Sequence, residues 1–391
     1  MLEGKEVVLG ITGSIAAYKG ADIASKLSQA GAAVNTVLTE SATRFISPLT
    51  FESITGKKAL AGLWENMPGI THITMAENAD IVLIAPATAN TIAKLANGIA
   101  DDMLSCTVLA TRAPVIIAPA MHTAMYENPV TQKNLDRLKE LGFIIVEPGE
   151  GRLASGGYGR GRLAETDIIT GTVKWVSSKD GDLAGKNLVI TSGGTREPVD
   201  PVRYLGNRSS GKTGYFLATA ARDRGARVKL ITTCKPFGEV VGIDVEYVET
   251  AAEMLVSVNR AIKSADCLIM AAAVADYRPA EIHSSKIKKK TADMDIRLVA
   301  TTDILAQAGG SILRVGFAAE TNNLEQGARE KLVSKKLDLV VANDVTQLDG
   351  GFGSDSNQVT LFFKDGTVEK LPLMPKSILA HRILDSLRLP G

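Results

Sequence analysis

The sequence has few cysteines, few aromatic residues and no long apolar run. Its 391 residues include three cysteines, none of them in a CxxC pair, and 5% aromatic residues. Three scattered cysteines are too few for a disulfide framework and lack the spacing of a structural zinc site. No apolar stretch reaches the roughly 18 residues of a membrane-spanning helix, and an immediate strand-like run leaves no room for a signal peptide. These absences predict a cytoplasmic protein without a membrane partner.

An excess of charge of one sign is missing as well. The 44 Lys and Arg residues and the 43 Asp and Glu residues give a net charge of +1. This balance provides no electrostatic reason to expect nucleic acid or an anionic membrane as a partner. A hydrophobic content of 45% is ordinary for a globular protein and excludes general disorder.

The chain length and the pattern of apolar residues predict two α/β domains. At roughly 100–200 residues per domain, the chain is long enough for two hydrophobic cores. Short β-branched runs alternate with longer helical patterns, which is typical of βαβ units and a mainly parallel sheet. Strands are predicted at 6–11, 33–38, 81–85, 114–118, 143–146, 186–191, 227–232, 267–271, 313–318 and 339–342. Helices are predicted at 16–30, 88–96, 101–111, 131–141, 213–224, 251–264, 323–336 and 376–387. The polar segment 176–185 is a predicted linker, so we expect two doubly wound Rossmann-like domains, residues 1–180 and 181–391.

Small-residue and polar turns follow three predicted strands of the first domain. The segment GITGSIAAYKG (10–20) opens a helix after the first strand, a geometry that offers backbone N–H groups and a helix dipole to phosphate. It lacks the third glycine of the GxGxxG fingerprint, so by itself it is equally compatible with a simple tight connection. PATANT (86–91) and PAMHTAM (119–125) lie at the carboxyl ends of two other strands, where doubly wound sheets bind ligands.

Together with NGIADDML (97–104), these motifs resemble those of the flavin-dependent cysteine decarboxylases. More specifically, they resemble the amino-terminal half of the bifunctional coenzyme A biosynthesis family, which joins phosphopantothenoylcysteine decarboxylase to phosphopantothenate–cysteine ligase. The resemblance implies a flavodoxin-like domain with tightly bound FMN. The FMN contacts that it implies are Gly13, Ser14, Thr39, Pro86, Thr88 and Asn90. It also implies that His122 and Met125 contact the substrate.

His72 is the implied active-site base of the first domain. A lone histidine is more often a surface or packing residue, but imidazole titrates near neutral pH and suits a proton acceptor during substrate oxidation.

Two residues depart from the commonest pattern of this family. His122 stands where many relatives have asparagine, and an imidazole can still donate to the substrate carboxylate. Ser155 stands in the glycine-rich flap LASGGYGRGR (153–162), where many relatives have a cysteine that donates the final proton. Because a hydroxyl is a much weaker acid than a thiol, the donor stays open between Ser155 acting through water and Tyr158. Ser155 is equally compatible with packing of the flap alone.

The second domain contains a string that matches a phosphate-binding pattern out of context. GNRSSGKT (206–213) fits GxxxxGK(S/T), but its strand ends at Thr191 and two prolines intervene, which argues against a true P-loop. The longer string TSGGTREPVDPVRYLGNRSSGKTG instead resembles the opening of the ligase half of the same family. The resemblance implies that Asn207 stabilises an acyl-nucleotide intermediate, for which a neutral amide donor is suited. It assigns Lys286 to the catalytic step.

Further nucleotide contacts are implied at four places. Asp276 in AAAVADY (271–277) follows a strand and is by itself equally a solvated turn, and the basic run KIKKK (286–290) is by itself a solvated loop. Lys331 and Lys335 share one face of a predicted helix. The implied nucleotide contacts are Ala271, Ala272, Ala273, Asp276, Lys286, Phe317, Lys331 and Lys335. The resemblance favours CTP, although the residues do not distinguish CTP from ATP. Mg²⁺ is expected to neutralise the phosphates, through ligands that the sequence does not identify.

The sequence thus predicts a bifunctional enzyme of coenzyme A biosynthesis. Its second domain would join 4′-phosphopantothenate to cysteine through an acyl-cytidylate, and its first would decarboxylate the product to 4′-phosphopantetheine. The resemblance implies a homo-oligomer, with trimers of the flavin domain and dimers of the ligase domain that together close a dodecamer. Two alternatives are a flavoprotein acting on peptidyl cysteine and a non-catalytic flavin-binding regulator. The second domain argues against the first of these, and His72 argues against the other.

Overall fold

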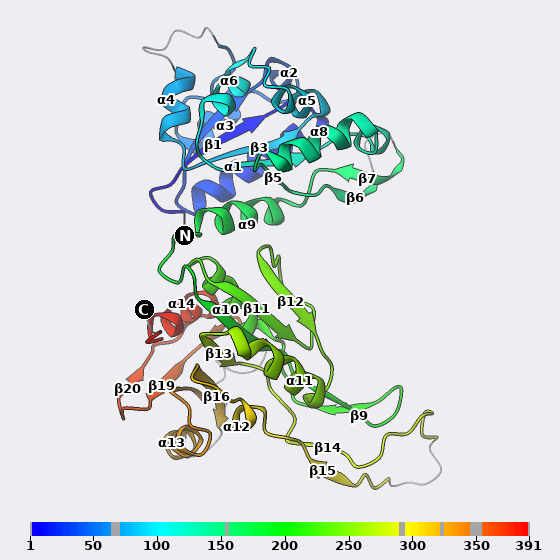
Figure 1. Cartoon of the computed structure of the whole chain (residues 1–391), viewed down its shortest axis with the longest axis vertical. Coiled ribbons are helices and arrows are strands. Elements are labelled where there is room, and N and C mark those ends of the chain that lie inside the picture. The colour runs from blue at the N-terminus through cyan, green and yellow to red at the C-terminus, as the bar shows by residue number, and fades with distance from the viewer. Residues whose placement is uncertain are drawn as a thin grey trace. The chain divides into compact units, whose positions relative to one another are not determined.

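Two sheets, one in each half of the chain, organise the structure. The computed structural model describes residues 2–63, 71–152, 156–288, 294–320, 324–344 and 354–389. The chain divides into two units, Met1–Ser178 and Lys179–Gly391, and each is an α/β sandwich with helices on both faces of its sheet (Figure 1). The predicted class of two doubly wound α/β domains is confirmed. Among the described residues, every helix is too short or too polar to traverse a lipid bilayer.

The first sheet is entirely parallel and has the strand order β2-β1-β3-β4-β5. This is the flavodoxin-like order, in which the chain changes direction between β1 and β3. Its strands are β1 (Glu6–Ile11), β2 (Ala33–Leu38), β3 (Ile81–Ala87), β4 (Val115–Pro119) and β5 (Ile144–Ile145). The helices are the 3₁₀ helix η1 (Ile15–Tyr18), α1 (Lys19–Gln29), α2 (Glu40–Thr43), α3 (Pro48–Thr55), α4 (Thr71–Asn78), α5 (Ala89–Ala96), α6 (Met103–Ala110), α7 (Thr123–Tyr126), α8 (Pro129–Glu140) and α9 (Thr166–Ser177). A separate antiparallel hairpin joins β6 (Gly149–Arg152) to β7 (Tyr158–Arg162).

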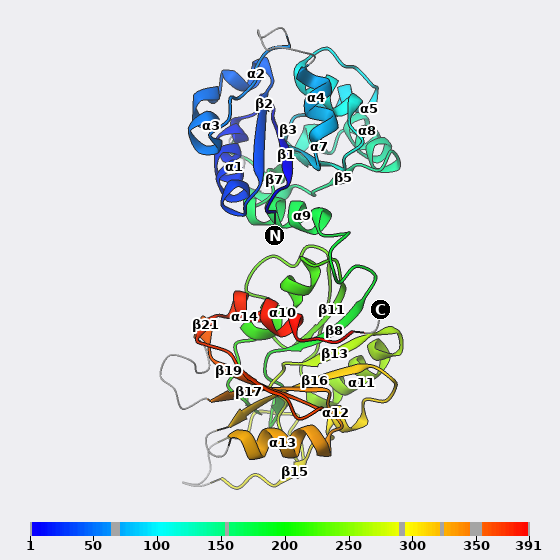
Figure 2. The same cartoon turned by 90° about the vertical axis from the view of Figure 1, so that its left-hand side faces the viewer.

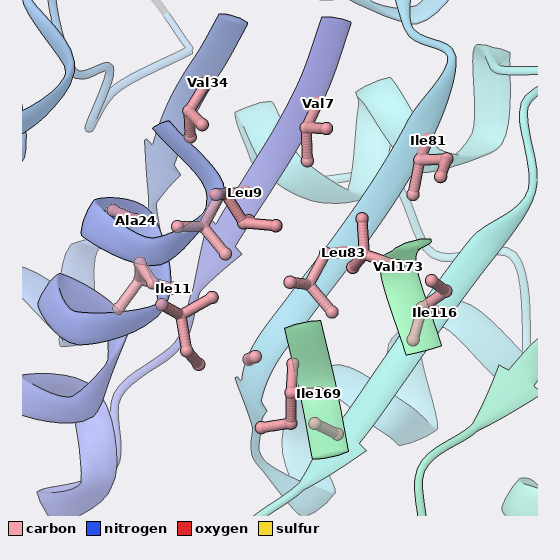
Figure 3. Packing of buried hydrophobic residues seen from close by; sticks show 14 of the residues in the cluster. Val7, Leu9, Ile11, Ala24, Val34, Ile81, Leu83, Ile116, Ile169 and Val173 are labelled. Carbon is pink, nitrogen blue, oxygen red and sulfur yellow. The ribbon is translucent and has the colours of Figure 1, made fainter. Parts of the chain in front are cut away.

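Both faces of the first sheet are covered, which explains its nearly continuous apolar strands. Val7, Leu9 and Ile11 of β1 point to the face that α1, α3 and α9 cover, where Ile169 of α9 packs (Figure 3). Val8 points to the opposite face, which is covered by α5, α6 and α8. A sheet buried on both sides exposes functional groups mainly at its strand ends, so the loops there form the site.

The parallel part of the second sheet has the order β12-β11-β8-β13-β16-β17, and its strands from β11 to β17 are labelled in Figure 2. Counted along the chain, this is the 3-2-1-4-5-6 order of a Rossmann fold, with the change of direction between β8 and β13. The strands are β8 (Asn187–Ser192), β11 (Arg227–Thr232), β12 (Ile243–Tyr247), β13 (Cys267–Met270), β16 (Leu313–Glu320) and β17 (Leu339–Asp344). Helices α10 (Lys212–Arg222) and α14 (Lys376–Asp385) cover one face. The other face is covered by α11 (Ala251–Ala261), α12 (Ile304–Gln307) and α13 (Leu324–Ser334), with the 3₁₀ helix η2 (Ile262–Ser264) after α11.

An antiparallel extension continues this sheet beyond β17. Strand β19 (Val359–Phe363) pairs antiparallel with β17, and β20 (Val368–Lys370) pairs with β19. Leu361 and Phe362 point into the cores on opposite faces, so β19 is a structural strand rather than an exposed edge. Short antiparallel pairs elsewhere join β9 (Arg196–Pro198) to β10 (Tyr204–Gly206), β14 (Tyr277–Pro279) to β15 (Leu298–Ala300), and β18 (Ser356–Asn357) to β21 (Met374–Pro375).

Candidate active sites

The turns after β1 and β3 are joined by hydrogen bonds at the point where the first sheet changes direction. The Thr12 hydroxyl donates to the carbonyl oxygen of Pro86 (2.7 Å) and accepts from the backbone N–H of Thr88 (3.0 Å). Gly13 approaches α2 so closely that an added Cβ would lie 2.4 Å from the Cβ of Ser41. The turns that follow β1, β2 and β3 therefore meet at one edge of the sheet.

Three helix N-termini converge on this edge. Ser14 caps η1 by accepting from the N–H of Ala16, Thr39 caps α2, and Thr88 caps α5. The residues predicted to bind FMN lie in these turns, at the end of β3 or in the first turn of α5: Gly13, Ser14, Thr39, Pro86, Thr88 and Asn90. Backbone N–H groups at helix starts and a glycine that permits close approach are the features that a flavin phosphate requires, so these residues fit FMN.

The turn after β4 presents His122 and Met125 to solvent. His122 caps α7, because its Nδ1 accepts a hydrogen bond from the N–H of Ala124 (3.2 Å), and Met125 is half exposed. The base of the glycine-rich flap packs on this turn, where the N–H of Met121 donates to the carbonyl of Gly161 (2.9 Å). Only glycine fits position 161, since φ is +133° and a Cβ would lie 2.4 Å from the Met121 oxygen.

The predicted base and the predicted proton donors of the first unit have no described hydrogen bond to these turns. His72 is half-buried in the first turn of α4, and no hydrogen bond within the described part of the chain links it to them. Ser155 lies outside the described residues, and Tyr158, at the start of β7, is 76% exposed.

A cavity of about 630 Å³ lies beside the carboxyl end of β13, where Met270, Ala272 and Ala273 line it. Most of the predicted nucleotide contacts line it together with Asn207: Ala272, Ala273, Asp276, Phe317, Lys331 and Lys335. The cavity wall also includes segment 301–305, which the sequence analysis did not single out. A usable signal was present there, because Asp303 precedes an apolar run and caps α12 through the N–H of Ala306.

Charged and amide groups in this cavity are held in fixed positions. Lys335 Nζ lies 3.0 Å from Asp303 Oδ2, and Lys331 Nζ donates to the carbonyl of Phe317 (2.6 Å). Burial by itself would raise the pKa of Asp303, but hydrogen bonds from Lys335 and from the Ala306 N–H outweigh it and lower that pKa. Asn207 Nδ2 donates to the carbonyl of Val274 (2.9 Å). The cavity thus combines two ammonium groups, an aromatic ring and an oriented amide, a set suited to a polyanion with a planar base.

A smaller cavity of about 140 Å³ adjoins the first and shares Ala272, Ala273 and Phe317 with it. Its other lining residues come from the approach to α10 and its first turn, and from single positions in or beside β13, β16, β17, β18 and α14: Ser209, Ser210, Gly211, Lys212, Thr213, Gly214, Ala271, Ala318, Asn343, Asn357 and Lys376. Ala271, a predicted nucleotide contact, therefore belongs to the smaller cavity rather than to the larger one.

Lys286 is exposed and lines neither cavity. Its neighbour Ile287 is nevertheless fixed, because its N–H donates to Asp200 Oδ2 (3.1 Å) and its carbonyl accepts from Arg203 Nη2 (2.6 Å). Burial by itself would raise the pKa of Asp200. Backbone N–H groups of Val202, Ile287 and Arg203, with the Arg203 guanidinium, outweigh burial and lower that pKa to about 2.

The depressed pKa of Asp200 predicts acid sensitivity. Its stabilising contribution is complete above the unfolded-state pKa of 3.8 and is lost as the pH falls through about 2. We expect Asp200→Asn to lower the thermal unfolding midpoint at neutral pH and to flatten its dependence on pH below about 4. Calorimetry across this pH range measures both effects, with Asp295→Asn, at an exposed position, as the control. An unchanged pH dependence in Asp200→Asn would contradict the role assigned to this carboxylate.

Comparison with known proteins gives the same division of the chain. The flavoprotein family model matches residues 1–177, and the model described as the DNA/pantothenate metabolism flavoprotein C-terminal domain matches residues 183–389. The chain is 45% identical to the coenzyme A biosynthesis bifunctional protein CoaBC of Bacillus subtilis, over 99% of this chain and 97% of that protein. It is 42% identical to CoaBC of Escherichia coli, over 99% and 97%.

Solved structures similar to the two halves include the C-terminal domain of a CoaBC protein and a PPC decarboxylase mutant complexed with pantothenoylaminoethenethiol. The first is 39% identical, with a TM-score of 0.45, and covers 52% of this chain and 94% of that one. The second is 34% identical, with a TM-score of 0.40, and covers 44% and 96%. Both family models and the full-length relatives agree with the motifs in the sequence, and the chain therefore belongs to the family of coenzyme A biosynthesis bifunctional proteins.

Proposed function

We propose that residues 181–391 ligate 4′-phosphopantothenate to cysteine with CTP, and that residues 1–180 decarboxylate the product to 4′-phosphopantetheine with FMN. The observation that carries the ligase assignment is the larger cavity, because Asn207, Lys331 and Lys335 all line it. Matches to both family models over one continuous chain argue against an enzyme that acts on peptidyl cysteine alone.

The charges of the larger cavity suit activation of a carboxylate by a nucleoside triphosphate. Lys331 and Lys335 would neutralise phosphate oxygens, while Phe317 offers a ring for stacking and Asp276 a carboxylate for the sugar hydroxyls. Asn207 would donate its amide N–H to the acyl oxygen as negative charge develops there. The described residues contain no cluster of three possible metal ligands, so we expect Mg²⁺ to be held mainly by the nucleotide phosphates.

Lys286 would act from the loop that Asp200 and Arg203 tether. The hydrogen bonds to the backbone of Ile287 limit the region that the ammonium of Lys286 can reach. They leave the side chain of Lys286 free to change its rotamer. This arrangement suits a cation that engages the phosphates only when the nucleotide is bound.

In the first unit, bound FMN would supply the reversible two-electron oxidation of the cysteinyl carbon beside the sulfur. His72 would take up the thiol proton released in this step. Nδ1 of His122 already accepts from a backbone N–H, so the proton of its neutral imidazole lies on Nε2, which can donate to the substrate carboxylate. Met125 would contact the substrate beside it. For the final proton we retain Ser155 as the proposed donor, with Tyr158 as the alternative.

Gly13→Ala tests the proposed phosphate turn of the flavin site. An added Cβ would lie 2.4 Å from the Ser41 Cβ and push α2 away from the turn, so we expect FMN affinity to fall about 10-fold. Flavin absorbance of the purified protein and fluorescence titration of FMN into apoprotein measure this. The matched control is Gly149→Ala, where the added Cβ would lie 3.8 Å from the carbonyl oxygen of Arg162, an ordinary van der Waals contact. Full FMN content in Gly13→Ala would contradict the placement.

The remaining proposals rest on the family. We propose a cytoplasmic homo-oligomer with trimeric contacts in the flavin domain and dimeric contacts in the ligase domain, which together close a dodecamer. Light scattering during size-exclusion chromatography measures the mass, and a monomeric protein would contradict this assembly.

The decisive experiment mixes the purified protein with 4′-phosphopantothenate, cysteine, Mg²⁺ and CTP, and follows the products by mass spectrometry. We expect 4′-phosphopantetheine, with phosphopantothenoylcysteine as a transient. A parallel reaction with ATP tests the nucleotide preference. Phosphopantothenoylcysteine alone would retain the ligase and contradict the decarboxylase, and neither product with either nucleotide would favour a flavin-binding regulator.

A further inference from the structure

Thr195 is a buried residue of the second unit for which the activity described above has no use. It lies in the turn after β8, directly after Gly193 and Gly194, and is 0% exposed. The described lining of the two cavities does not include it. Its hydroxyl accepts a hydrogen bond from the backbone N–H of Ala275 (2.9 Å), in the turn that follows β13. The effect of Thr195 therefore depends on the peptide group to which this N–H belongs.

The N–H of Ala275 and the carbonyl of Val274 belong to one peptide group. A trans peptide group is planar, so its N–H and its carbonyl point in opposite directions and turn together. The carbonyl of this group accepts from Nδ2 of Asn207 (2.9 Å). Thr195 and Asn207 thus bind opposite ends of the same rigid group, and the contact at one end fixes the orientation of the other.

The carbonyl of Val274 also determines which way the amide of Asn207 is turned. A carbonyl oxygen only accepts hydrogen bonds, so it faces the NH₂ group of Asn207 rather than Oδ1. One N–H of this NH₂ group binds Val274, and the other can donate to the acyl oxygen on which we propose that negative charge develops. The hydrogen bond from the peptide N–H to Thr195 polarises the carbonyl and strengthens it as an acceptor.

The peptide groups on both sides of this one are held by other contacts. Ala273 donates its N–H to the carbonyl of Gly193 (2.8 Å), and its carbonyl accepts from the backbone N–H of Thr195 (3.3 Å). The carbonyl of Ala275 accepts from the hydroxyl of Thr301 (2.6 Å). Removing the Thr195 hydroxyl would therefore free the intervening peptide group while its neighbours stay in place.

We propose that Thr195 is a positioning residue of the ligase, which orients the amide of Asn207 through the peptide group between Val274 and Ala275. This inference rests on the proposed ligase function. Without the hydroxyl, the buried N–H of Ala275 would lose its partner, and the peptide group would turn to find another one. Its carbonyl would turn as well, and the amide of Asn207 would lose its fixed orientation. The rate of the chemical step should respond more than nucleotide binding, because Thr195 is not part of the cavity lining.

The test compares Thr195→Val, which keeps the shape of the side chain and removes the acceptor, with Thr195→Ser, which keeps the hydroxyl. Thr195→Val is also combined with Asn207→Ala, so that the two changes form a double-mutant cycle. The matched control is Thr219→Val in α10, where the hydroxyl donates to backbone carbonyls of its own helix. Pyrophosphate release gives the ligase kcat and the KM for CTP.

Thermal unfolding shows whether the second unit of each variant is folded, and decarboxylation of phosphopantothenoylcysteine is the activity control for the first unit. If Thr195→Val does not fold, Thr195→Ala removes the same acceptor with a smaller side chain and takes its place in the cycle.

We expect Thr195→Val to lower the ligase kcat about 10- to 100-fold, because a small displacement of a positioned group slows a reaction strongly. The KM for CTP should stay unchanged. Thr195→Ser should regain most of the wild-type kcat, and Thr219→Val should retain it. In Asn207→Ala, the added Thr195→Val should lower kcat less than about twofold, since the amide on which Thr195 acts is absent.

Three results would overturn the proposal and leave the ligase function intact. The same fold-loss of kcat with and without Asn207 would mean that Thr195 acts independently of that amide. A wild-type kcat in Thr195→Val would mean that the hydroxyl is not needed. An equal loss in Thr195→Ser would assign the effect to packing of the methyl group. An inactive wild type would instead contradict the proposed ligase function.

Discussion

Replacing Asn207 with alanine is expected to lower the ligase kcat by about 100- to 1,000-fold, the usual effect of removing one oriented donor from a developing oxyanion. The amide of Asn207 is held by the carbonyl of Val274 at 2.9 Å and lines the larger cavity. Its orientation is therefore set before substrate binds, and alanine cannot replace it. The KM for CTP should change less than kcat, because the interaction strengthens as charge develops.

The chain provides an internal control for this variant. Pyrophosphate release and carbon dioxide release are measured on the same preparation, and we expect the decarboxylase rate of Asn207→Ala to equal that of the wild type. Asn259→Ala, in α11 and outside both cavities, controls for loss of an asparagine from the second unit. A wild-type ligase kcat in Asn207→Ala would remove Asn207 from the catalytic step.

His72→Asn is expected to impair the decarboxylase and to leave the ligase active, the reverse of Asn207→Ala. Loss of a positioned base costs about 100- to 10,000-fold, so the decarboxylase should nearly stop while ligation continues and phosphopantothenoylcysteine accumulates. Asparagine retains polarity at a half-buried position without titrating near neutral pH, so α4 should keep its packing. Product ratios by mass spectrometry measure the effect.

Flavin absorbance distinguishes catalysis from cofactor loss in this variant. We expect His72→Asn to retain FMN, because His72 has no hydrogen bond to the turns proposed to hold it within the described residues. Unimpaired conversion to 4′-phosphopantetheine would contradict the assignment of His72 as the base.

The strands were the most predictable part of the fold. β1, β2 and β11 have the predicted bounds, because each is rich in β-branched and other apolar residues, is buried in its second half and ends at a polar turn. α3, α4 and α9 were not predicted, and neither was the β6–β7 hairpin, whose glycine-rich strands carry no apolar alternation. The antiparallel extension was missed because strand direction is set by tertiary pairing, which the local pattern of β19 does not encode.

Some site residues could likewise be predicted from the sequence, and others could not. Residues in turns after strands could be predicted, since parallel strands bring their carboxyl ends together. The larger cavity accordingly unites Asn207, Asp276 and Lys335 from distant segments. Asp303 could have been recognised as a helix cap, but nothing in its short segment places it in the cavity wall. Lys376, which lines the smaller cavity, belongs to no motif. Lys376 is notable because it is buried. The residues around this helix start are of mixed polarity, so the sequence does not predict that burial.

Alanine side chains at 272 and 273 form part of the wall that the two cavities share. The backbone there is fixed, because the N–H of Ala273 donates to the carbonyl of Gly193 (2.8 Å). Every other residue except glycine is larger, so most substitutions would narrow the space for the acyl-nucleotide intermediate that we propose for the larger cavity. A compound that fills this space would therefore meet few resistance mutations at these positions, since a side chain that excludes the inhibitor also excludes the intermediate.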